Sequence, residues 1–164
     1  MGTTTFSGPV VSKAGFITGT DAVAESVTSA TLVITSANGL ADAYNGEVIP
    51  LNRAAGITVT LPAATGSQAV YTFLVGTTFT GSGIIQVANA TDTLNGFASV
   101  GGTTASLFGT LPASDTLTMN GTTTGGLAGS FITLRDVATG DWIVNANLIG
   151  TAVTPATPFS AAVS

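Results

Sequence analysis

The sequence predicts an all-β fold: a compact antiparallel β-sandwich or barrel, with the jelly roll among the forms left open, and an extended N-terminal arm. From Glu47 onward, Thr, Val, Ile and aromatic residues dominate, and apolar residues frequently alternate with polar ones. Gly, Pro, Asn or Asp interrupts this pattern at a spacing of roughly ten residues, which is typical of sandwiches and barrels. No segment sustains a helical period with caps, so a helix-rich fold is disfavoured.

Short runs of β-branched and apolar residues define the expected strands. The first is TLVIT at 31–35, and the segment 21–30 before it is expected to form either a short helix or an extended turn. The later strands are expected near 47–53, 57–61, 69–75, 83–88, 97–100, 105–108, 115–120, 130–137 and 141–148. Turn-forming residues bound each of them, which favours short strands over long ones.

Two pairs of these strands are predicted to be hairpins. In the first pair, 57–61 has an apolar face and a threonine face, and 69–75 is apolar on both faces, as in a central strand. In the second pair, a short loop joins 130–137 to 141–148, and Gly140 is available for a positive φ. The side chains expected to anchor the core are Val59, Leu61, Tyr71, Phe73, Phe131 and Trp142.

The chain divides into an N-terminal arm and linker at 1–40 and a β-rich body at 41–164. Two interpretations of the arm stay open. It is either a tail without fixed structure or an extended arm that inserts apolar side chains into pockets of a neighbour. A solvated tail is expected to carry more charge than this segment does. The candidate contacts of such an arm are Phe6, Pro9, Val10, Phe16 and Ile17.

Charge is unusually scarce. Charged residues make up 7% of the chain, against roughly 25% in ordinary soluble domains, and the net charge is −5. The three bases, Lys13, Arg53 and Arg135, are too scattered to track phosphates, so we expect no nucleic-acid partner and no membrane partner. A free monomer normally uses charge to stay soluble and to protect sheet edges. The chain is therefore expected to cover much of its surface in an assembly.

The residue types of common catalytic and metal sites are missing. The chain has no His and no Cys, which removes the commonest general base, the commonest metal ligand and any thiolate. A glycosidase-like carboxylate pair and a calcium loop are the alternatives, but the acids stand singly and do not alternate as in an EF-hand. These acids are Asp21, Glu25, Asp42, Glu47, Asp92, Asp115, Asp136 and Asp141. We expect no enzyme activity, no catalytic residue, no cofactor and no metal.

Four stretches resemble one known family. They are TTTFSGPVVSKAGF at 3–16, GITVTLPAATGSQAVYTFLVGT at 56–77, IIQVANATDTLNG at 84–96, and the run at 119–151. In these stretches the chain resembles the head decoration proteins of tailed bacteriophages, also called capsid-stabilising or cement proteins. The stretches cover about half of the chain in order, and none is a catalytic motif. One departure is Gln68, which stands in a loop where the family has a small Gly.

The resemblance implies a non-enzymatic virion protein on the outer capsid surface. Such a head protein binds the major capsid protein and stabilises the capsid by bridging neighbouring capsomers. It also implies a homo-oligomer, for which a trimer is the expected form. The candidate arm contacts given above would then touch the capsid or a neighbouring subunit.

A receptor-binding or tail-fibre module that recognises a cell-surface glycan is the main alternative. A fibre tip should expose aromatic and acidic side chains clustered at one end of the body. Tyr44, Tyr71 and Trp142 instead lie within or beside expected strands, which favours the core. An enzyme acting on host glycan and a filament-forming structural protein are the remaining alternatives.

Overall fold

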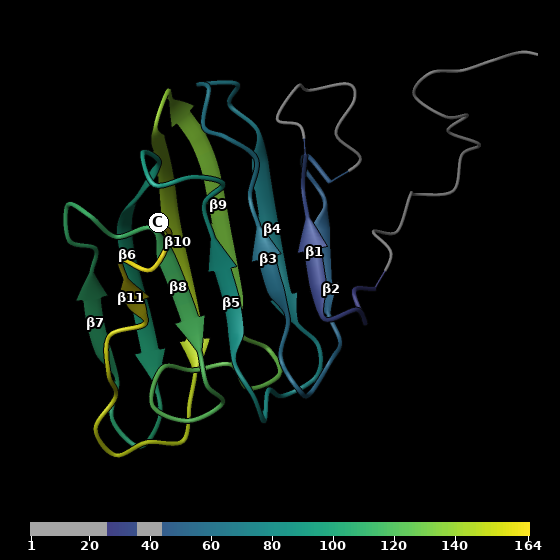
Figure 1. The fold of residues 1–164 in the computed structure, drawn as a ribbon. Helices are drawn as coiled ribbons and strands as arrows, with labels where there is room; N and C mark the ends of the chain where they lie inside the picture. Colours follow the sequence, from purple (N-terminus) through teal and green to yellow (C-terminus); the bar gives the residue numbers. More distant parts are fainter. Residues whose placement is uncertain (1–25, 36–43) are drawn as a thin grey trace, which may run out of the picture.

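The computed structural model describes residues 26–35 and 44–164, in which eleven strands form two sheets packed face to face (Figure 1). The five-stranded sheet contains, in spatial order, β1 (Thr31–Val33), β3 (Thr58–Thr60), β5 (Gly83–Gln86), β8 (Thr116–Met119) and β11 (Phe159–Ser160). The six-stranded sheet contains β2 (Val48–Leu51), β4 (Val70–Val75), β9 (Phe131–Ala138), β10 (Asp141–Ile149), β6 (Thr93–Gly101) and β7 (Ser106–Gly109). These residues include no helix that is long and apolar enough to cross a membrane.

The predicted all-β sandwich is confirmed, and the two sheets do not close into a barrel. Both sheets are mixed, whereas antiparallel sheets were expected. β1 pairs with β3, β3 with β5, β2 with β4, and β10 with β6 in parallel. Parallel neighbours need crossover connections, and in this fold the crossovers pass through the opposite sheet.

The chain alternates between the two sheets from β1 to β6, so that it winds around the core. Leu32, Val59 and Ile85 lie side by side in the five-stranded sheet, although 27 and then 26 residues separate them in the sequence. In the six-stranded sheet, 24 residues separate Val27 from Leu51 and 24 separate Leu51 from Val75. One turn of the winding therefore consists of one strand in each sheet and the two connections that cross between the sheets.

This winding contradicts the first predicted hairpin. The strands expected at 57–61 and 69–75 exist as β3 and β4, but they belong to different sheets. Val59 of β3 and Tyr71 of β4 both point into the core from opposite sides, and each is 0% exposed. Alternation of apolar residues is the same for a hairpin and for a crossing between sheets, so the pattern could not distinguish them.

The second predicted hairpin is confirmed. β9 and β10 pair in antiparallel fashion around the turn at Gly140, whose φ is +82°. Trp142, Val144 and Ala146 point into the core, and the intervening residues of β10 point outward. This hairpin is inserted between two strands of the winding, because β9 pairs with β4 and β10 pairs with β6.

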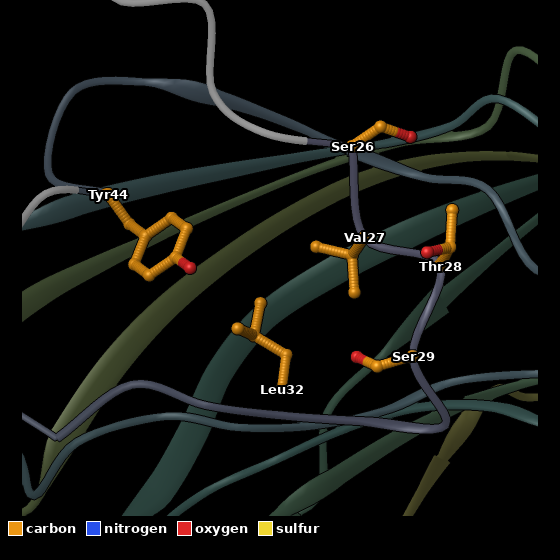
Figure 2. Close-up of a pocket in the computed structure, with 6 residues that line it drawn as sticks. All are labelled: Ser26, Val27, Thr28, Ser29, Leu32 and Tyr44. Atoms are coloured by element: carbon orange, nitrogen blue, oxygen red, sulfur yellow. The ribbon is translucent and has the colours of Figure 1, made fainter.

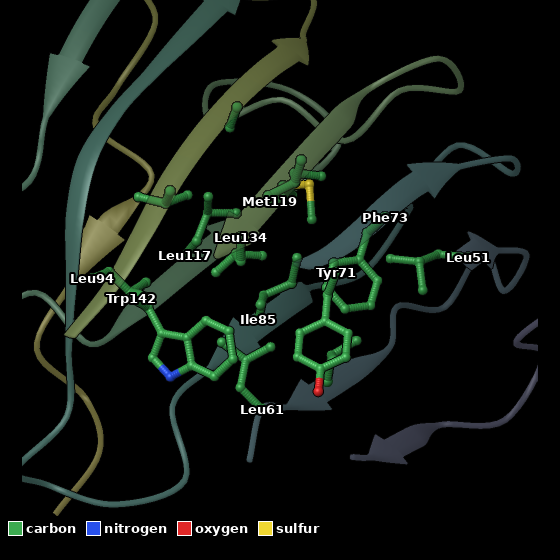
Figure 3. Packing of buried hydrophobic residues seen from close by; sticks show 14 of the residues in the cluster. Leu51, Leu61, Tyr71, Phe73, Ile85, Leu94, Leu117, Met119, Leu134 and Trp142 are labelled. Atoms are coloured by element: carbon green, nitrogen blue, oxygen red, sulfur yellow. The ribbon is translucent and has the colours of Figure 1, made fainter. Parts of the chain in front are cut away.

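Five of the six predicted core anchors are buried. Val59, Leu61, Tyr71, Phe73 and Trp142 are each at most 1% exposed. The rings of Tyr71 and Trp142 lie 5.7 Å apart at a tilt of 40°, within the favourable range for aromatic pairs (Figure 3).

Phe131 is a correction to the predicted core, because it is 39% exposed. Ile132 and Leu134 on the same strand are 0% exposed, so the inward side of β9 begins one residue later than expected. A shift of one residue along a strand moves a side chain to the other face of the sheet.

Several boundaries also differ from expectation. β6 begins at Thr93 rather than near 97, and the two-residue β11 was not predicted. β1 lies within the 1–40 segment assigned to the arm and linker, yet it pairs with β3 as part of the sandwich. The described residues of 21–30 are extended, since Val27 forms a parallel bridge with Leu51. Residues 1–25, including all five candidate arm contacts, lie outside the described residues.

Candidate functional site

Three buried carboxylates of the body, those of Asp92, Asp115 and Asp136, accept hydrogen bonds from backbone groups that are distant in the sequence. The Asp92 carboxylate accepts a hydrogen bond of 2.9 Å from the backbone N–H of Ala64. The Asp115 carboxylate accepts from the backbone N–H groups of Ala162 and Val163, at 2.8 and 3.2 Å, and so fixes the segment after β11. Both carboxylates therefore bind backbone groups of the protein itself, and Asp115 also accepts from the hydroxyl of Thr116 at 2.7 Å.

Asp136 is the most heavily bonded of them and is 0% exposed. One oxygen accepts from the N–H of Gly66 at 2.7 Å. The other accepts from the N–H of Ser67 at 2.9 Å, its hydroxyl at 2.7 Å, and the N–H of Thr65 at 3.1 Å. Burial alone would raise the pKa of Asp136, but the hydrogen bonds from Ser67, Gly66 and Thr65 together hold it below the ordinary value. Asp136 thereby attaches the crossing between β3 and β4 to β9.

The described residues offer little for catalysis or metal binding. Nowhere in 26–35 and 44–164 do three carboxylates gather into a group that would hold a metal ion. A hollow of about 180 Å³ lies at the β1–β2 end of the sandwich and is lined by Ser26, Val27, Thr28, Ser29, Leu32 and Tyr44 (Figure 2). None of these six described residues is charged, and hydroxyl groups without a base are poor nucleophiles.

The outer face of the six-stranded sheet is the most distinctive surface. We use this name for the outward-pointing residues of β2, β4, β9, β10, β6 and β7. Six of the nine large apolar side chains that are clearly exposed in the described chain lie there. They are Val48 (46% exposed), Phe97 (48%), Leu107 (68%), Phe131 (39%), Ile143 (44%) and Ile149 (43%).

Strand register brings these side chains into rows across the sheet. One row runs from Leu74 through Phe131, Asn147 and Ser99 to Leu107. The next row joins Val48, at one edge, to Phe97 near the other, through Thr72, Thr133 and Asn145. Neighbouring strands lie about 4.8 Å apart, so each row spans on the order of 20 Å.

Charge is almost absent from this face. The charged side chains at its outward positions are Arg135 on β9 and Asp141 at the start of β10. Neutral amides and hydroxyls fill the space between the apolar side chains, as at Asn145 and Asn147. A rigid surface of exposed apolar groups mixed with uncharged polar groups resembles the composition of protein interfaces, in which charge is depleted.

The opposite outer face is different. On the five-stranded sheet the outward positions that reach the surface hold mainly threonine: Thr31, Thr58, Thr60 and Thr118. Thr116 has the same parity but is only 3% exposed. Val33 at the edge is its one clearly exposed large apolar side chain among the described residues. The molecule therefore presents an apolar face on one side and a hydroxyl face on the other.

Sequence reasoning did not identify this apolar face. The sequence signal of this face is an apolar residue at an outward position of a strand whose inward positions are also apolar. Phe131 and Ile143 are examples. The sequence analysis therefore placed Phe131 in the core, whereas the structure places it on this face. Comparisons of the chain with protein-family models, curated proteins and solved structures returned no match.

Proposed function

We propose that the chain is a non-enzymatic structural protein of a bacteriophage virion, a decoration or cement protein. It binds the outside of the capsid through the outer face of the six-stranded sheet. The observation that carries this proposal is that face, with six exposed apolar side chains and almost no charge on a rigid sheet. The resemblance of four sequence stretches to head decoration proteins supplies the partner, the major capsid protein.

The mode of action follows from binding thermodynamics. A protein that binds the assembled shell, and not its separated subunits, stabilises the shell by mass action. Contacts to two capsomers at once raise the effective concentration of the second contact, so modest affinity at each site is sufficient. The width of the outer face suits such bridging, because exposed apolar groups lie at both of its edges, at Val48 and Leu107.

A glycan-binding fibre module fits the described residues less well. Glycan sites combine aromatic platforms with free polar groups that orient the sugar. Here Tyr71 and Trp142 are buried, and the carboxylates of Asp92, Asp115 and Asp136 are bonded to the backbone. Among the described residues, the clearly exposed aromatic side chains are Phe97 and Phe131, which lie on the open sheet. Half-buried Tyr44 is the aromatic side chain among the residues that line the hollow.

The proposal is tested by placing charge on the outer face. We expect the Phe97→Asp/Ile143→Asp variant to bind capsid shells of the encoding phage at least about tenfold more weakly, as for loss of central interface anchors. Binding is measured by co-sedimentation of the purified protein with shells. Both side chains are about half exposed, so the variant is expected to fold.

The matched control is Leu111→Asp, which adds the same charge at a residue that is 74% exposed and lies between β7 and β8, off the face. We expect the control to bind like the unmodified chain. Equal binding by the face variant and the control would contradict docking through this face. Binding of the unmodified chain to glycan but not to shells would favour the fibre module.

A further inference from the structure

The β7 edge of the six-stranded sheet is bordered by described residues throughout. β7 is the last strand of this sheet, and β2 lies at the opposite edge (Figure 1). Ser26 and Tyr44, at which the two described ranges begin, line the hollow at the β1–β2 end. The segments that precede, follow and flank β7, at 101–105, 110–115 and 150–158, all belong to the described chain, in which no strand pairs with the outer side of β7.

The hydrogen bonds between β6 and β7 show which backbone groups of β7 face outward. The N–H of Thr110 donates to the carbonyl of Gly96 at 3.0 Å, in register with the antiparallel pairing of the two strands. Such hydrogen-bonded pairs recur at every second residue, so Phe108 also bonds to β6. The N–H and C=O groups of Leu107 and Gly109 therefore point to the outer side, where no described residue pairs with them.

This edge lacks the features that usually keep sheet edges apart. Residues 101–114 contain no charged residue. β7 has no proline, and its register with β6 is continuous, without a bulge. Charged side chains, proline and bulges are the features by which natural sheets prevent pairing between edges. An edge without them readily accepts another strand.

The most exposed apolar side chains of the described chain border the same edge. Leu111, Leu107 and Val153 are 74%, 68% and 68% exposed, more than any other large apolar side chain described. Leu107 lies within β7, and Leu111 follows the end of the strand. Val153 lies beside its beginning, because the Val153 carbonyl accepts a hydrogen bond from the Thr104 hydroxyl. Exposed apolar groups gathered in this way indicate an interaction surface.

We propose that β7 pairs with β7 of a second copy of this chain, in antiparallel fashion and about a two-fold axis at Leu107. In this register Leu107 lies opposite Leu107 of the second copy, and Gly109 lies opposite Ala105. The outward backbone groups then meet in about six hydrogen bonds. Leu111 of each copy comes beside the beginning of β7 in the other copy, where Val153 is exposed.

The occupant is a second copy because the edge is complementary to itself. Antiparallel pairing places the end of each strand beside the beginning of the other, and exposed apolar side chains lie at both places. Neither strand carries charge, so two copies bring no like charges together. The row of outward residues from Leu74 to Leu107 also continues across the axis into the second copy.

This contact is independent of the proposed function. Docking uses the outer face of the sheet, whereas this pairing uses the backbone edge of β7, and a single copy can dock without it. The experiments below need only the isolated chain, so failure of one proposal leaves the other untouched. The contact is also separate from the three-fold contact of the expected trimer, since closed assemblies combine two-fold and three-fold axes.

The absence of cysteine from the chain permits a direct test. In the Leu107→Cys variant, the two thiols would be neighbours across the axis, with about 5.5 Å between their Cα atoms. Leu107 is 68% exposed, so its replacement should not disturb folding. We expect a short bis-maleimide reagent to give a covalent dimer on a denaturing gel. Mass spectrometry should find the link between residue 107 of one chain and residue 107 of the other.

The matched control is Ile143→Cys, which places the thiol on β10 of the same sheet, two strands away from β7. Ile143 is 44% exposed, so the reagent can reach it. In the proposed pair, the two copies of residue 143 would lie about 24 Å apart, beyond the span of a short reagent. We therefore expect at least about tenfold less covalent dimer. Equal yields from the two variants would overturn the proposal.

A second measurement needs no reagent. Leu107→Lys places two like charges beside each other at the axis, as natural edges do to avoid pairing. We expect this variant to pair at least about tenfold more weakly than the unmodified chain, measured by sedimentation velocity of the isolated protein. Ile143→Lys, the same charge elsewhere on the sheet, should pair like the unmodified chain.

Equal pairing by the Leu107→Lys variant and the unmodified chain would contradict the contact. Another outcome would assign the edge to a different occupant. If the unmodified chain does not pair, and Leu107→Lys nevertheless loses binding to capsid shells, the edge receives a strand of the capsid protein and the second copy is ruled out.

Discussion

At the scale of single residues, the buried carboxylates are the least predictable feature of this protein. The sequence correctly indicated that the acids stand singly. It did not indicate that Asp136 is bonded to Thr65, Gly66 and Ser67, because about seventy residues separate these groups along the chain. Turn patterns in a sequence depend on residues close together along the chain, so they cannot predict a hydrogen bond between distant segments.

Asp136 should make stability depend on pH. Its pKa lies below the ordinary value of 3.8, so its contribution to stability is complete above about pH 5 and is lost as the pH falls through 3.8 and below. We expect Asp136→Asn to lower the free energy of unfolding by about 3 kcal/mol at pH 7. The variant loses hydrogen bonds to a buried charge, and the NH₂ group of its side chain would face backbone N–H donors where the carboxylate has an acceptor oxygen. Chemical denaturation at pH 7 measures this cost.

The control for this prediction is Asp141→Asn. Asp141 is half-buried and accepts from the side chains of Thr93 and Asn95, at 3.2 Å each, and from no backbone donor among the described residues. Asp141→Asn should lower the free energy of unfolding by about 1 kcal/mol or less.

The Asp136→Asn variant should also lose less stability than the unmodified chain between pH 5 and pH 3. An unchanged pH profile in that variant would show that other groups dominate acid unfolding.

At the scale of strands, the sequence predicted most elements but not their sheets. Alternation of apolar residues at β3, β4 and β10 gave their positions to within one or two residues. The same alternation occurs whether two successive strands face each other across the core or pair within a sheet. Assignment to sheets depends on which backbone groups pair, and side-chain patterns do not encode this.

Gly96 tests the pairing of β6 with β10, which sequence patterns missed. Its φ is +147°, and a Cβ at this position would overlap the carbonyl oxygen of Val144 on β10. We expect Gly96→Ala to lower the free energy of unfolding by more than about 2 kcal/mol, because both the backbone and the strand pairing are strained.

Gly46 provides the comparison. Its φ is +83°, and a Cβ there would meet nothing within 4 Å, so Gly46→Ala carries only the backbone cost of about 1 kcal/mol. Denaturant titration of the two variants gives the difference. If both lose the same stability, the close approach of β6 to β10 contributes nothing beyond the backbone conformation.

At the scale of the whole molecule, the two outer faces have opposite character, and composition alone indicated only their average. Low charge predicted a surface that other chains cover. It could not indicate that the exposed apolar side chains gather on the six-stranded sheet while threonine covers the other. Such separation arises when outward positions from β2 to β7 become neighbours, although they are distant in sequence.

The low charge leads us to expect a closed oligomer in solution, with a trimer as the expected form. Closed symmetry buries apolar surface without leaving a growing end, whereas an open contact would build filaments. Light scattering with size exclusion at micromolar concentration measures the mass. A monomeric mass of 16.0 kDa would count strongly against the oligomer, and a mass that grows with concentration would favour the filament.

The inserted hairpin has a consequence for how the chain is made. β4 and β6 belong to successive turns of the winding, but in the six-stranded sheet β9 and β10 separate them. During synthesis, the first turns emerge well before residues 131–149, and until then β7 is the one of the two native partners of β6 that has been made. Completion of this sheet therefore waits for a late part of the chain. Because these pairings are distant in sequence, we expect folding to be slow and largely post-translational.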